Sequence, residues 1–189
     1  MSSDQAAHPT HPAYTGVHEH EPPARAVPGT GEPERHILVV LVMDRPGVLN
    51  RVASLMRARN FNIDSLAVSR TDKPHISRMT LTLHGDTVAV EQAAKQLYRL
   101  IDVLKVQDVT ADQLVEHELA LIKVRATDAN RAEIIKIVEL YKGSIVDVSA
   151  DSVIVEAHGT EAEIDALVAL VQGYGIKELV RTGATVMLR

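Results

Sequence analysis

The sequence predicts an α+β fold built from two consecutive βαββαβ units, each an antiparallel sheet with helices on one face. Segments with strand and helix periods follow one another in the order β-α-β-β-α-β from His36 onward, and the same order returns after residue 116. The composition, with 46% apolar and 24% charged residues, is that of a globular protein. Two units of just over 70 residues in this order are typical of the ferredoxin-like arrangement.

The first unit opens with a continuous apolar run of strand length. Turn residues at 71–74 separate its two middle strands, and apolar residues at helical spacing mark its two helices. The expected elements are, in order, a strand over 37–43, a helix with Val48, Leu49, Val52, Ala53, Leu55 and Met56 on its apolar face, strands over 62–70 and 76–84, a helix with Val90, Ala93, Ala94, Leu97 and Ile101 on its apolar face, and a strand over 103–109.

The second unit repeats these periods after a short connection at residues 110–116. Gly143 lies where the third helix should end, and we interpret it as a C-terminal cap. The expected elements are strands over 117–126, 145–148, 153–157 and 176–181, a helix over 131–141, and a helix marked by Ile164, Leu167, Val168 and Val171.

Residues 1–35 differ from the rest of the chain. They contain six of the eight prolines and four of the nine histidines, with almost no large aliphatic side chains. Such a segment buries too little apolar surface to offset its ordering entropy. We therefore expect a disordered tail over 1–35, a first domain over 36–110 and a second domain over 117–189.

The composition also excludes several classes of partner. A net charge of -5 disfavours nucleic acid and anionic lipid, and an aromatic content of 3% leaves few rings for base stacking. No apolar run approaches the roughly 20 residues that span a bilayer, and the lack of cysteine suits a reducing compartment. We expect a cytoplasmic protein that binds neither nucleic acid nor membrane.

Sequence patterns of catalytic and metal sites are absent. There is no Gly-x-Ser-x-Gly, Walker-type or His-Glu-x-x-His motif, and the histidines after the tail lack metal-ligand spacing. We expect a binding module without cofactor, metal or activity of its own.

Because small units with uncovered edge strands invite pairing, we also expect a homodimer or larger assembly.

One segment has residues suited to binding a small molecule. It lies between the first strand and the first helix and reads Asp44-Arg45-Pro46-Gly47-Val48-Leu49. Pro46 suits the first position of a helix, and Gly47 allows close approach of a ligand. Free N–H groups of the first helical turn could bind a carboxylate, with about 0.3–1 kcal/mol from the helix dipole. Asp44 could accept hydrogen bonds from an ammonium group. A free amino acid has both groups, although the same residues could form a turn without a ligand.

Several further segments share a pattern with one known family. They are residues 59–68 (Arg-Asn-Phe-Asn-Ile-Asp-Ser-Leu-Ala-Val), 76–80, 96–106, 118–124, 145–148 and 174–183. Together with the loop they resemble the ACT domain, a small-molecule sensing module, and more narrowly the regulatory (small) subunit of acetolactate synthase. The resemblance covers residues 36–189.

In that family the small subunit activates a large catalytic subunit, a transferase that carries thiamine diphosphate, Mg²⁺ and FAD. It also confers feedback inhibition by valine or another branched-chain amino acid. The resemblance therefore implies an allosteric regulatory subunit of branched-chain amino-acid biosynthesis, whose effector is valine, leucine or isoleucine. The effector contacts that it implies, at the interface of two first-unit ACT domains, are Asp44, Gly47, Val48, Leu49, Asn62 and Ile63. The first alternative is a free-standing double-ACT sensor that acts on another enzyme or a transcription factor. The second is an enzyme in its own right, which turnover by the purified chain alone would indicate.

The two units are expected to differ in role. The turn of the second unit that corresponds to the loop, residues 126–131, has neither proline nor glycine and offers its backbone N–H groups poorly. We therefore expect the first unit to bind the effector and the second to activate the catalytic partner.

Overall fold

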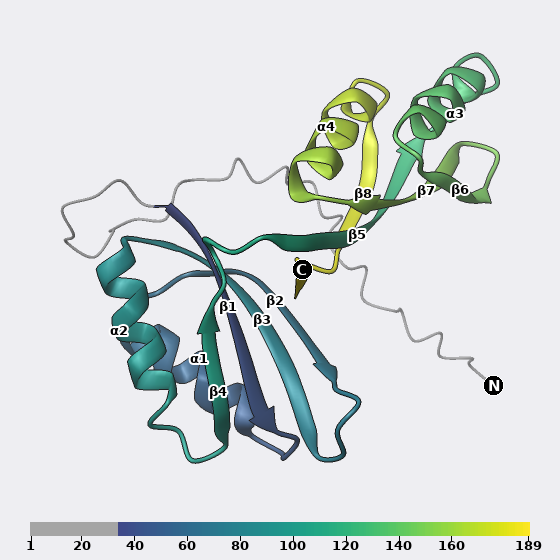
Figure 1. The fold of residues 1–189 in the computed structure, drawn as a ribbon. Coiled ribbons are helices and arrows are strands. Elements are labelled where there is room, and N and C mark those ends of the chain that lie inside the picture. Colours follow the sequence, from purple (N-terminus) through teal and green to yellow (C-terminus); the bar gives the residue numbers. More distant parts are fainter. Residues whose placement is uncertain (1–33) are drawn as a thin grey trace, which may run out of the picture.

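The computed structural model describes residues 34–189, so the expected tail lies almost entirely outside the described residues. The first unit consists of β1 (Glu34–Met43), α1 (Val48–Ala58), β2 (Ile63–Arg70), β3 (Ile76–Gly85), α2 (Thr87–Leu97) and β4 (Val103–Asp108). The second consists of β5 (Leu114–Arg125), α3 (Arg131–Leu140), β6 (Ser144–Val148), β7 (Ser152–Gly159), α4 (Glu161–Gln172), β8 (Ile176–Arg181) and β9 (Thr185–Leu188). The predicted α+β fold class is confirmed (Figure 1).

Both sheets are antiparallel and have the same strand order. The first sheet runs β2-β3-β1-β4 and the second β6-β7-β5-β8, with β9 added to β5. The helices of each unit lie on one face of its sheet (Figure 1). The long strands β1 and β3 lie in the middle of the first sheet, which leaves β2 and β4 as its edges.

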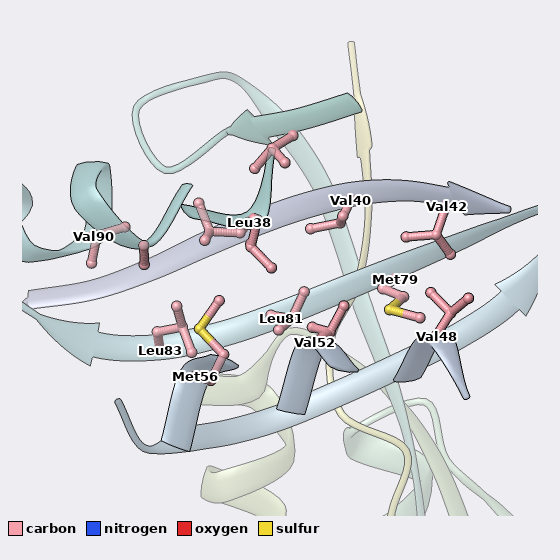
Figure 2. Packing of buried hydrophobic residues seen from close by; sticks show 13 residues of the cluster. Leu38, Val40, Val42, Val48, Val52, Met56, Met79, Leu81, Leu83 and Val90 are labelled. Atoms are coloured by element: carbon pink, nitrogen blue, oxygen red, sulfur yellow. The ribbon is translucent and has the colours of Figure 1, made fainter. Parts of the chain in front are cut away.

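The core of the first unit forms between its helices and one face of its sheet (Figure 2). Alternate residues of β1 point into it, and Leu38, Val40 and Val42 are fully buried, as strand geometry requires. Val52 and Met56 of α1 meet them from the helix side. Each large side chain buried in this way contributes roughly 1.5–3 kcal/mol. This packing holds the start of α1 firmly against the end of β1.

Four details differ from the sequence-based expectations. The strand β1 begins at Glu34, three residues before the strand expected over 37–43, and β5 begins at Leu114, inside the connection expected at 110–116. The strand β9 was not expected at all; it pairs with the first residues of β5. Ile101 is 92% exposed because α2 ends at Leu97 and a turn follows.

The end of α3 corrects the expectation about Gly143. Lys142 has the left-handed backbone (φ 56°), and the N–H of Gly143 donates to the carbonyl of Val138 at 2.9 Å. These bonds form a Schellman ending with lysine in the position that glycine usually takes. Gly143 is needed for another reason, because a Cβ there would lie 3.0 Å from the carbonyl oxygen of Glu156.

Within residues 34–189, no helix is long and apolar enough to cross a membrane.

Candidate functional site

The loop between β1 and α1 is held in place by backbone hydrogen bonds. The N–H of Asp44 donates to the carbonyl of His75 at 2.8 Å, which ties the loop to the β2–β3 turn. Gly47 precedes the first residue of α1 and has φ 83°, a conformation that other residues adopt at a cost. Pro46 therefore lies one residue before the cap, not at the first helical position as the sequence predicted.

The first turn of α1 leaves two backbone donors free. Gly47 has no side chain to cap the helix, and the N–H groups of Leu49 and Asn50 have no acceptor within residues 34–189. Such donors, at the positive end of the helix dipole, are suited to an anion. The arrangement expected for a carboxylate is therefore present in the backbone.

A guanidinium group lies beside these donors. The nearest atom to a Cβ built on Gly47 would be Nη1 of Arg51, at 3.6 Å. Arg51 forms a short ion pair with Asp102, whose side chain is 5% exposed, and Arg45 approaches the same carboxylate at 3.9 Å. The carbonyl of Asp102 also accepts the N–H of Met43 at 2.8 Å. Asp102 thus orients positive charge toward the loop.

The other predicted loop residues are available to a ligand in different ways. The carboxylate of Asp44 is paired with Arg70 at 3.0 Å, so an ammonium group would have to share it. The side chain of Val48 is buried in the core and offers a ligand only its backbone. Leu49 is 44% exposed and presents its side chain beside the free donors.

Asn62 and Ile63 do not join the loop within one chain. Ile63 pairs through Leu83 with His36 near the start of β1, whereas the loop follows Met43 at the other end. Seven residues along a strand correspond to about 23 Å. The predicted contacts therefore form two separate groups at opposite ends of the sheet.

Comparison with known proteins identifies the family. A model described as AHAS small subunit-like ACT domain matches residues 38–105, and one described as small subunit of acetolactate synthase matches residues 117–189. The probable acetolactate synthase small subunit of Archaeoglobus fulgidus is 47% identical over 155 residues, 82% of this chain and 97% of its relative. That of Bacillus subtilis is 44% identical over 156 residues, 82% and 91% of the two chains. The chain belongs to the family of acetolactate synthase small subunits.

A solved small subunit has the same fold. The crystal structure of the acetolactate synthase small subunit from Thermotoga maritima matches with a TM-score of 0.76 at 37% identity, over 82% of this chain and 98% of that chain. The resemblance inferred from the sequence is thus confirmed, and with it the ACT domain in the first unit.

The contacts predicted from the sequence lack three residues of this small subunit's loop region: Asn50, the residue after Leu49, and the ion pair of Arg51 and Asp102. Arg51 follows Gly47 by four residues, so helical spacing alone could have placed it beside the loop. Asp102 is 51 residues farther along the chain, and no local signal connects it to Arg51. Among the described residues, no group of three or more His, Cys, Asp or Glu side chains is placed to hold a metal.

Proposed function

We propose that this chain is the regulatory subunit of an acetolactate synthase. It binds and activates a catalytic subunit that carries thiamine diphosphate, Mg²⁺ and FAD, and it confers feedback inhibition by valine, leucine or isoleucine. Family membership supports the partnership and the regulatory role. The observation that carries feedback inhibition is the start of α1, where two free N–H groups, Gly47 and Arg51 converge. A cytoplasmic location is part of the proposal.

Each functional group of a branched-chain amino acid has a counterpart in this arrangement. The carboxylate binds the N–H groups of Leu49 and Asn50, with the guanidinium of Arg51 nearby. The ammonium group binds beside Asp44, and the aliphatic side chain packs on Leu49. One chain supplies only this half of the site; Asn62 and Ile63 of a second copy supply the other half.

The edge strand β2 provides a route to that second copy. In an antiparallel pair of β2 strands, the Arg70 end of one copy, beside the loop, meets the Ile63 end of the other. Asp64 near one end and Arg70 at the other are then oppositely charged neighbours, whereas a parallel pair would place like charges together. We therefore propose a homodimer through β2, with the effector bound across it.

The second unit is assigned the activation of the catalytic partner. Its corresponding turn uses its polar groups internally: the side chain of Asn130 accepts the N–H of Thr127 at 2.6 Å, and its carbonyl accepts the N–H of Glu133 at 3.1 Å. An effector bound between the first units of two copies then shifts the equilibrium between two arrangements of the small subunits that the catalytic subunit contacts. Couplings of this kind are typically about 1–3 kcal/mol, or roughly 5- to 150-fold in affinity.

Two variants of one position test the site. Gly47→Asp places a carboxylate where the effector carboxylate would bind, whereas Gly47→Asn adds the same volume without charge; both residues tolerate positive φ better than others. Titration calorimetry with valine, leucine and isoleucine measures binding, and reconstituted pyruvate condensation measures stimulation and inhibition. We expect Gly47→Asp to abolish binding and inhibition, Gly47→Asn to weaken them less, and stimulation to survive in both. Full sensitivity of Gly47→Asp to the effector of the parent chain would show that the site lies elsewhere.

A further inference from the structure

The last residues of the second unit cross onto the first sheet. We call residues 182–188 the C-terminal strap. It starts at Thr182, whose N–H donates to the carbonyl of Leu119 on β5 and whose hydroxyl accepts the N–H of Leu119, both at 3.1 Å. It continues as β9, which pairs with residues 114–117 of β5, close to the first sheet (Figure 1).

The strap buries apolar side chains against the face of the first sheet that carries no helices. Ala184 and Val186 are 4% and 3% exposed and form a small core with Ile37 and Val39 of β1. Val109 and the partly buried Leu114 complete it. Because of this core, β1 is buried on both faces over these residues. The strap is thus packed as closely as an interior segment.

Two further contacts extend from the strap to β3 and β2. The guanidinium of Arg78 on β3 donates to the carbonyl of Val186 at 2.7 Å. Gly183, with φ 78°, lies against Ser65 on β2, where a Cβ on the glycine would be 2.8 Å from the Cβ of Ser65. Ser65 is two residues from Ile63, on the strand proposed to form the effector-binding edge.

We propose that the C-terminal strap couples the effector-binding edge of the first unit to the second unit. A displacement of β2 at Ser65 meets Gly183 directly, and closely packed contacts transmit such shifts because they cannot deform freely. Thr182 and β9 pass the shift to β5, which is continuous with the sheet of the second unit. The inference rests on the proposed regulatory function, to which it adds the route of the signal.

A substitution and a second one that compensates for it test the coupling in the full chain. Gly183→Ala pushes against Ser65 and strains the left-handed backbone, whereas Ser65→Gly combined with Gly183→Ala removes the clash. Arg78→Gln disrupts the strap independently, since it removes the donor to Val186. Met187→Ala, at a strap residue that is 69% exposed, is the matched control.

Three measurements are made on each variant: effector binding by calorimetry, stimulation and inhibition with the catalytic partner, and amide hydrogen exchange of the strap. For Gly183→Ala and Arg78→Gln we expect the amide exchange rate of the strap to rise about tenfold or more. Effector affinity should stay within about threefold of the parent, and stimulation should persist. Maximal inhibition should fall at least about twofold. The double variant should recover part of the inhibition, and Met187→Ala should match the parent.

The outcomes separate this inference from the proposed function. A parent chain that neither binds nor responds to any of the three amino acids overturns the proposed function and this route with it. If the parent chain responds to an effector, and the strap variants show faster amide exchange but full inhibition, the coupling role alone is overturned. Unchanged strap exchange in both Gly183→Ala and Arg78→Gln would show that these contacts do not hold the strap, and would also overturn it.

Discussion

Asp102 shows how a single buried residue organises the proposed site. Its carboxylate pairs with Arg51 and Arg45, and its carbonyl accepts the N–H of Met43 directly before the loop. A charged acceptor that is this well buried contributes more than an exposed one, because solvent does not replace it. The position of the Arg51 guanidinium therefore depends on a residue outside the loop.

Replacing that carboxylate tests its role. Asp102→Asn keeps the size of the side chain but loses the charge that holds Arg51, and we expect unfolding free energy to fall by about 1.5–3 kcal/mol. Effector affinity should fall about tenfold, measured by calorimetry at a temperature where the variant is folded. Asp112→Asn, at an exposed position, serves as the control. Parent-like affinity in Asp102→Asn would show that Arg51 does not take part in binding.

In the candidate site, the sequence indicates only those residues that lie close together along the chain. The loop could be predicted because a strand, Pro46-Gly47 and a helical period follow one another within a few residues. Asp102 could not, because only the folded sheet brings it to Arg51. The separation of the loop from Asn62 follows from the topology, because β2 runs parallel to β1 and therefore begins at the other end of the sheet.

At the scale of elements, periodicity predicted twelve of the thirteen helices and strands that the structure has between residues 34 and 189. The exception, β9, has four residues and follows β8 after only three residues, beyond the last strand that was expected. Its partner, the first part of β5, lies within the connection expected at residues 110–116. Both differences concern the pairing of β9 with the start of β5. This pairing forms where the two segments meet on the first sheet.

The capping box of α4 provides a prediction for an element. The N–H of Thr160 donates to Glu163 at 2.8 Å, and this bond, helped by the Thr160 hydroxyl, lowers the pKa of the Glu163 carboxyl. A lowered pKa in the folded state means that the stabilisation is present above the unfolded pKa and is lost as pH falls through the folded one. We expect Glu163→Gln to lower the melting temperature at pH 7 and to differ little from the parent near pH 3.

Thermal unfolding of parent and Glu163→Gln at both pH values measures this difference. Gly159 makes the box possible, since a Cβ there would lie 2.7 Å from a carboxylate oxygen of Glu163. An equal difference in melting temperature at pH 7 and pH 3 would mean that the charge of Glu163 contributes nothing to the box.

At the scale of the whole molecule, the proposed assembly of copies depends on the edges of the first sheet. The strap covers part of one face and the helices cover the other, but β2 remains an open edge with Val68 44% exposed. An open edge of eight residues readily pairs with another strand. Assembly through β2 would also complete the proposed site, because it joins the loop of one copy to Asn62 and Ile63 of the other.

Charge exchange along β2 tests this assembly. Arg70→Glu places like charges opposite each other in an antiparallel pair, as does Asp64→Lys, and each pair of charges occurs twice in a symmetric dimer. We expect each single variant to raise the dimer dissociation constant about tenfold and the double variant to return within about threefold of the parent, as measured by sedimentation equilibrium. Because each substitution also removes a partner within its own chain, Asp44 or His84, recovery in the double variant is the decisive result. Two weakened single variants without recovery would mean that the strands do not pair antiparallel, and two unaffected ones would mean that copies assemble through another surface.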